Sequence, residues 1–154
     1  MVRENITTEE LKANNAKYIG LMKEVLTPQE YEKWVVWAKG SDLFVAPAST
    51  KYHSVYVGGL VDHMLGVYEF IYKTNTMLGN IYSKRSITLA SLMHDYCKVG
   101  VYKTEIRRRK VDGQWTDVEE YVFHDDYPFG HGEKSVDIIN EIGIVLTRDE
   151  KDLS

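Results

Sequence analysis

The chain has 154 residues, of which 44% are hydrophobic and 27% charged, and this composition is typical of one globular domain with a single core. Its formal net charge of −4 argues against general nucleic-acid binding, and its single cysteine excludes an internal disulfide and a zinc site built from thiolates. The sequence contains neither the apolar core of a secretory signal nor the ~18 consecutive apolar residues of a membrane span. We therefore expect a cytoplasmic protein without a membrane partner.

An N-terminal helical pair is expected over residues 1–40. The first helix should cover residues 8–25 and begin after Thr7 or Thr8, where the pattern of apolar residues takes a helical period. The second follows the sequence "TPQE" at residues 27–30, which has the pattern of a capping box. Its threonine caps the helix, its proline occupies the first turn, and its glutamate reaches back to the cap.

A long irregular loop is expected next, over residues 41–59, because this segment contains Pro47 and ends on two glycines. Two apolar helices should follow the loop. The first is predicted over residues 58–78 and the second over residues 86–97, with Ser86 as its cap. We expect these two helices to pack against each other.

Each of these apolar helices carries polar groups that point to a metal site. His63 lies among residues that should face the core, and His94 and Asp95 interrupt the apolar run of the next helix. A lone core histidine is more often a satisfied core residue than a ligand. Here, however, three such groups must be satisfied, and an unpaired buried carboxylate is especially costly. One divalent cation would satisfy all three, because imidazole and carboxylate suit first-row metals.

The rest of the chain adds a hairpin and short helices. A β-hairpin is expected near residues 101–122 around the turn sequence "DG" at 112–113, followed by a helix over residues 130–143. The three consecutive arginines at 107–109 should be exposed charge on the hairpin, although they could also bind a polyanion. A second capping box begins at Thr147 and should open a further helix.

The sequences "DHMLGV" at 62–67 and "SLMHDYCKVG" at 91–100 are together similar to the signature of the HD-domain metal-dependent phosphohydrolases. In that family a helical histidine and a later adjacent His-Asp pair hold the metal, and a lysine follows the pair. "KYHSVYVGGLVDH" at 51–63 resembles the lead-in to the first ligand, and "GHGEKS" at 130–135 resembles the Gly-His element of two-metal members. The resemblance covers roughly residues 44–145. Within the family, the sequence is most similar to small HD hydrolases that are often encoded by phages and their bacterial hosts.

The resemblance implies an all-α HD-domain helical bundle with one inserted β-hairpin, in which residues 58–154 form the metal-binding core of a single domain. It implies a phosphohydrolase in which metal-activated water attacks a nucleotide or a related phosphate ester, in a bacterial or phage-infected cell. The cofactor would be one or two divalent ions (Mn, Mg, Fe, Co, Ni or Zn). Two alternatives stay open, namely a non-catalytic HD-fold module that binds metal or nucleotide, and a di-iron HD-fold oxygenase.

The resemblance also assigns roles to individual residues. The implied site consists of the catalytic residues Asp95 and Lys98, the metal ligands His63, His94, Asp95 and His131, and the substrate-binding residues His53, Tyr56, Lys98 and His131. Lys98 could neutralise phosphate charge or form a structural pair with Asp95 or Glu105. His131 could instead cap the helix that follows it.

Family members usually take a last aspartate ligand from a helix near the end of the domain, and this sequence ends at Ser154, where that helix would begin. We therefore expect a C-terminally truncated domain that binds metal weakly. An apolar surface on the helix that contains His63 should then be uncovered. Such surfaces favour self-association, so a homodimer is expected as a partner state.

Overall fold

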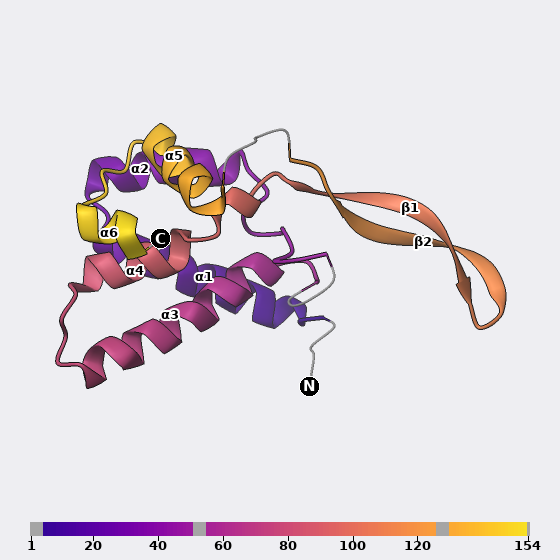
Figure 1. The fold of residues 1–154 in the computed structure, drawn as a ribbon, viewed down its shortest axis with the longest axis horizontal. Coiled ribbons are helices and arrows are strands. Elements are labelled where there is room, and N and C mark those ends of the chain that lie inside the picture. Colours follow the sequence, from indigo (N-terminus) through magenta and orange to yellow (C-terminus); the bar gives the residue numbers. More distant parts are fainter. Residues whose placement is uncertain (1–4, 51–54, 126–129, 154) are drawn as a thin grey trace.

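The computed structural model describes residues 5–50, 55–125 and 130–153, apart from the side chains of residues 131, 149, 152 and 153. Its elements, in chain order, are α1 (Thr8–Val25), α2 (Pro28–Lys39), α3 (Gly59–Met77), α4 (Lys84–Met93), a 3₁₀ helix η1 (Tyr96–Lys98), β1 (Tyr102–Val111), β2 (Gln114–Phe123), α5 (His131–Ile142) and α6 (Arg148–Leu153). The helices gather into one body, from which the two strands project as an arm (Figure 1).

This architecture confirms a mostly helical protein with one antiparallel hairpin. Its identity as an HD-domain bundle stays a prediction. No helix in the described part of the chain is both long enough and apolar enough to cross a membrane.

Local capping signals set the beginnings of α1 and α2. Thr7 caps α1, and its hydroxyl accepts a hydrogen bond of 3.1 Å from the backbone N–H of Glu10. The predicted capping box of α2 is present in both directions. The Thr27 hydroxyl accepts from the Glu30 N–H at 3.2 Å, and the Glu30 carboxylate accepts from the Thr27 N–H at 3.0 Å. Both helix starts therefore follow from side chains within four residues of the cap.

The helices share one core, at whose centre three polar aromatic groups are hydrogen-bonded in series. Trp34 Nε1 lies 2.9 Å from the Tyr96 hydroxyl, which lies 2.8 Å from the Tyr18 hydroxyl, and Tyr18 donates to the carbonyl of Leu92. Because an indole N–H only donates and a carbonyl only accepts, Tyr96 must donate to Tyr18. Burial raises the pKa of both phenols, so they stay protonated and the series stays intact.

Helix α4 corrects the predicted limits of 86–97. Its cap is Ser83, whose hydroxyl accepts from the Ser86 N–H at 3.1 Å, so the cap lies three residues earlier than expected and the helix begins at Lys84. It also ends earlier, at Met93, because the chain turns into η1 there. His94 and Asp95 therefore stand in a turn at the end of the helix rather than on its face. The predicted packing of α3 on α4 is confirmed.

The hairpin has the predicted turn and nearly the predicted limits. Its strands pair antiparallel from Tyr102 with Phe123 to Val111 with Gln114, so it extends one residue beyond the expected range of 101–122. The two turn residues at 112 and 113 have φ values of 50° and 80°. A two-residue hairpin turn of this type requires positive φ at both positions, which Asp-Gly provides.

Arg85 on α4 connects three parts of the helical body. Its guanidinium donates to both carboxylate oxygens of Glu30 at 2.9 and 3.0 Å, and to the carbonyl of Val145 at 3.0 Å. Burial acts to raise the pKa of Glu30, but the bonds from Arg85 and from the N–H groups of Thr27 and Val145 outweigh it and lower that pKa to about 2. The body is therefore held by charge as well as by apolar packing.

The outward side of α3 is apolar toward the C-terminal end of the helix. Phe70 is 72% exposed and Met77 is 87% exposed, and Leu78 and Ile81 beyond the helix are also largely exposed. Large exposed apolar patches are uncommon on monomers and often mark contact surfaces. Exposed apolar side chains are therefore present at this end of α3, while the uncovered docking surface and the homodimer stay predictions.

Candidate metal centre

The packing of α3 on α4 brings His63, His94 and Asp95 together. Oδ2 of Asp95 lies 3.3 Å from Nε2 of His63 and 3.1 Å from Nε2 of His94. The candidate ligand atoms of the three residues all lie within 4.8 Å of one another. In the part of the chain that the structure describes, no other group of three or more His, Cys, Asp or Glu side chains comes together in this way. The predicted ligands from two separate elements therefore converge on one point.

A glycine fixes how the chain enters α3, one turn before His63. Gly58 has φ of 81°, and a Cβ added there would lie 2.3 Å from Cδ1 of Leu11 on α1. Only glycine combines this backbone conformation with such a close approach at low cost. The entry geometry of α3, and with it the position of the His63 ring, therefore depends on Gly58.

A backbone hydrogen bond orients the ring of His94. Its Nδ1 lies 2.7 Å from the carbonyl oxygen of Ser91, and because a carbonyl only accepts, Nδ1 must carry the proton. In the neutral imidazole this leaves the lone pair on Nε2, the atom that faces Asp95. Metal-binding histidines are commonly held in this way, with the second ring nitrogen donating to a carbonyl.

The three side chains also perturb one another electrostatically. Burial acts to raise the pKa of Asp95, but hydrogen bonds from His63 and His94 and the charge of Lys98 hold it well below its usual range. Burial acts to lower the pKa of His94, but its hydrogen bond to Asp95, the charge of that carboxylate and the bond to the Ser91 carbonyl together outweigh burial and raise the pKa. The carboxylate is therefore ionised at neutral pH and attracts positive charge into a largely buried position.

Lys98, the last residue of η1, adds a positive charge to the cluster. Its Nζ lies 3.4 Å from Oδ2 of Asp95 and donates to the carbonyl of Ala48 at 2.8 Å. Of the two structural partners considered for Lys98, the structure places Asp95 beside it. Glu105 instead contacts Arg107 and His124 on the exposed hairpin. The ammonium group of Lys98 thus lies at the candidate site, held by a backbone carbonyl.

Of the other predicted site residues, the structure describes the side chain of Tyr56 but not those of His53 and His131. The buried hydroxyl of Tyr56 donates to Asp62, which also accepts from Asn14 at 3.2 Å. Tyr56 therefore braces the first turn of α3 beside the site, and its role as a substrate contact stays a prediction. His53 lies outside the described residues. His131 begins α5, but its side chain is outside the described part, so its roles as ligand or substrate contact also stay predictions.

Sequence reasoning missed one residue that touches the site, Ser135 on α5. Its fully buried hydroxyl donates to the carbonyl of His94 and accepts from the N–H of Cys97, both at 3.0 Å. The only indication in the sequence is that Ser135 belongs to the segment "GHGEKS", in which the histidine is the predicted site residue. Cys97 itself is buried, and burial raises the pKa of its thiol.

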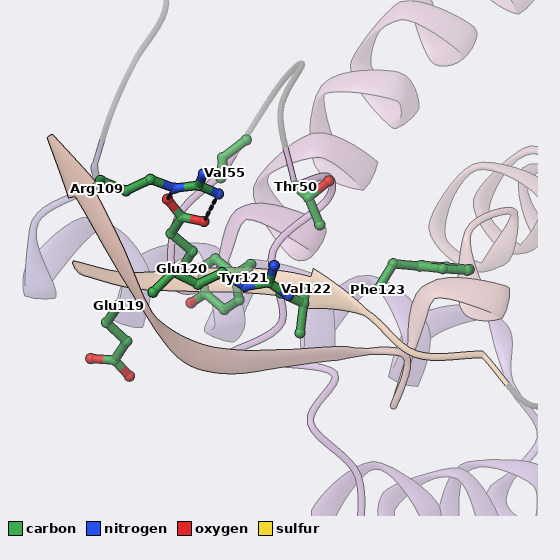
Figure 2. A pocket seen from close by; sticks show the side chains of 9 residues that line it. Thr50, Val55, Arg109, Glu119, Glu120, Tyr121, Val122 and Phe123 are labelled. Carbon is green, nitrogen blue, oxygen red and sulfur yellow. Dashed lines mark hydrogen bonds and ion pairs between the residues drawn. The ribbon is translucent and has the colours of Figure 1, made fainter. Parts of the chain in front are cut away.

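A cavity of about 720 Å³ lies against the hairpin and away from this cluster. Figure 2 shows residues of β2 along it, with Thr50 and Val55 on the other side. The guanidinium of Arg109 binds the carboxylate of Glu120 through two hydrogen bonds of 2.8 and 3.0 Å (Figure 2). None of the three converging ligands is among the described residues that line the cavity, so it is separate from the candidate metal centre.

No protein-family model matches the chain, and neither a curated protein nor a solved structure matches it. The functional interpretation therefore rests on the residues of the site and on their geometry.

Proposed function

We propose that the protein is a divalent-metal-dependent phosphohydrolase that acts on a nucleotide or a related phosphate ester. The observation that carries the proposal is the convergence of His63, His94 and Asp95, with the ammonium group of Lys98 beside the carboxylate. The similarity of these residues in type and order to the motif of HD-domain phosphohydrolases supports the reaction class.

Two of the three distances between the ligand atoms match those expected around a single ion. Two atoms that are each ~2.1 Å from a common cation lie about 3.0 Å apart at a right angle and about 3.4 Å apart at a tetrahedral angle. The distances from Oδ2 of Asp95 to the two histidine nitrogens, 3.1 and 3.3 Å, fall within this range. One carboxylate and two neutral imidazoles are also a ligand set that first-row divalent metals accept.

The residues of the chain have separate tasks in the proposed reaction. A divalent cation held by this set would lower the pKa of a water ligand and polarise a phosphoryl oxygen. His63, His94 and Asp95 fix its position and leave coordination positions for water and substrate. Lys98 places a positive charge next to the site, where it can neutralise phosphoryl oxygens, and the Ala48 carbonyl holds that charge in place.

An isosteric variant tests this proposal most cleanly. Asp95→Asn keeps the shape of the side chain but removes its charge, so we expect turnover of nucleotides in the presence of Mn²⁺, Mg²⁺, Co²⁺ or Ni²⁺ to fall by at least ~100-fold. Asp117→Asn on the hairpin is the matched control, because Asp117 is an exposed carboxylate paired with Arg108, and it should leave turnover unchanged.

The outcomes also separate the alternatives. Absence of turnover in the wild-type protein, for mononucleotides, phosphomonoesters and phosphodiesters with each metal, would refute the phosphohydrolase. Metal or nucleotide binding without turnover would favour the non-catalytic module. Iron in the purified protein together with a visible absorption band would favour the di-iron oxygenase.

A further inference from the structure

The candidate ligands His94 and Asp95 stand where α4 ends, so their positions depend on what holds that end. Helix α4 stops at Met93, and the backbone turns before η1 begins at Tyr96. The last carbonyls of a helix have no partner within the helix and must find one elsewhere. Here side chains provide those partners.

Three carbonyls at the end of α4 are bound by three different side chains. The carbonyl of Ser91 accepts from the ring of His94, and the carbonyl of Leu92 accepts from the hydroxyl of Tyr18. The carbonyl of His94 accepts from the hydroxyl of Ser135. The turn is thus tied to α1 and to α5 as well as to itself.

Ser135 differs from the other two side chains because it binds the chain on both sides of Asp95. Its oxygen donates to the carbonyl of His94 and accepts from the N–H of Cys97, at 3.0 Å in each case. The Ser135 hydroxyl therefore fixes the distance between the backbones of His94 and Cys97, which lie on either side of Asp95. Ser135 has no exposed surface, so water cannot easily replace it.

We infer that Ser135 is a positioning residue of the metal centre, which holds the turn so that His94 and Asp95 present their ligand atoms to one cation. This inference rests on the proposed function, because it assumes that the site binds a metal. It also gives α5 a defined task at the site. The serine of "GHGEKS" acts through the backbone of the ligand turn, without touching the ion.

The test compares two buried serines by titrating Ni²⁺ calorimetrically. Ser135→Ala removes both bonds to the turn, so we expect Ni²⁺ affinity to fall by about 10–100-fold, the usual cost of losing a group that orients ligands. Ser86→Ala is the matched control. Its side chain is also buried on α4, but its hydroxyl bonds Ser83 and Glu150 at the other end of the helix. It should lower thermal stability and leave the affinity within about twofold.

A second variant covers the case in which Ser135→Ala fails to fold. Ser135→Cys keeps the volume but offers only a weak donor and acceptor, so a smaller loss of Ni²⁺ affinity is expected. Wild-type affinity in the folded Ser135 variants would overturn the inference. So would an equal loss of affinity in Ser86→Ala, because the effect would then be general destabilisation.

Amide hydrogen exchange of Cys97, measured by NMR on the metal-free protein, separates the failure of this inference from that of the proposed function. The exchange should accelerate in Ser135→Ala and not in Ser86→Ala, because this N–H donates to Ser135 and Ser86 lies at the other end of α4. If wild-type protein binds no Ni²⁺, the metal centre is wrong, and the exchange data still report whether Ser135 holds the turn. Unchanged exchange in Ser135→Ala would show that it does not.

Discussion

The helical body contains a largely buried ion pair between Arg85 and Glu30, whereas the ion pairs of the β-hairpin are partly or largely exposed to solvent. Arg85 and Glu30 in the body are largely buried and share further backbone partners. On the hairpin, Arg108 and Asp117 are each 71% exposed, and their charged atoms are 3.7 Å apart. Exposed pairs contribute little because water screens them, while breaking a buried pair leaves an uncompensated charge. The same residue types therefore fix geometry in one region and mainly add surface charge in the other.

The largest expected effect comes from breaking the buried pair. Arg85→Ala leaves the Glu30 carboxylate without its main partner, so we expect the free energy of unfolding to fall by about 3–5 kcal/mol. Urea denaturation followed by circular dichroism measures the change. A loss below about 1 kcal/mol would mean that the Arg85–Glu30 pair stabilises the fold no more than an exposed ion pair does.

The free energy of unfolding should depend on pH below 4.5 because of the same Arg85–Glu30 pair. The pKa of Glu30 is lowered to about 2 from an ordinary value of 4.5, so its ionised form stabilises the fold above pH 4.5. This contribution, about 3 kcal/mol, is lost as the pH falls from 4.5 toward 2. Glu30→Gln should flatten this part of the curve, measured by urea titrations at several pH values. An unchanged slope would show that other carboxylates cause the acid sensitivity.

A smaller effect is expected from the neutral network in the core of the body. Tyr96→Phe removes the hydroxyl that accepts from Trp34 and donates to Tyr18, leaving both groups without this partner. We expect a loss of about 1–3 kcal/mol in the free energy of unfolding. Tyr121→Phe on the hairpin is a useful control because that side chain is only partly buried. Equal losses in the two variants would contradict the contrast between the regions.

The smallest effect is expected on the hairpin. Arg109→Ala removes two hydrogen bonds to Glu120, yet the arginine is 55% exposed, so the loss in the free energy of unfolding should be the smallest of the four variants. The loss should shrink further in 0.5 M salt, because salt screens exposed charges. A loss as large as that of Arg85→Ala, and insensitive to salt, would show that the ion pairs of the hairpin stabilise the fold as much as the buried pair does.

The elements that could be predicted are those that local chemistry decides. The caps at Thr7, Thr27 and Thr147 bind N–H groups within three residues, and the Asp-Gly turn needs only its own positive φ values. The start of α4 was placed wrongly because serines at positions 83 and 86 both fit a cap pattern, and only the first one caps.

The end of α4 could not be read from the sequence at all. The run "SLMHDYCK" continues a helical pattern, and the chain leaves it where Tyr18 and Ser135 bind the carbonyls of Leu92 and His94. Both partners are far away in sequence. For the same reason the motif identified His63, His94 and Asp95, but it did not show what orients them.

The most direct test of whether His63 and His94 bind one cation is X-ray absorption spectroscopy at the nickel K-edge of the Ni²⁺-loaded protein, because it detects imidazole ligands around a bound ion. We expect one Ni²⁺ per chain with imidazole nitrogens from both His63 and His94 at ~2.0–2.1 Å, and His63→Ala should lose one of them. His124→Ala is the control, because His124 is exposed and contacts Glu105 on the hairpin. A wild-type spectrum without imidazole scattering, or an identical spectrum in His63→Ala, would contradict the account.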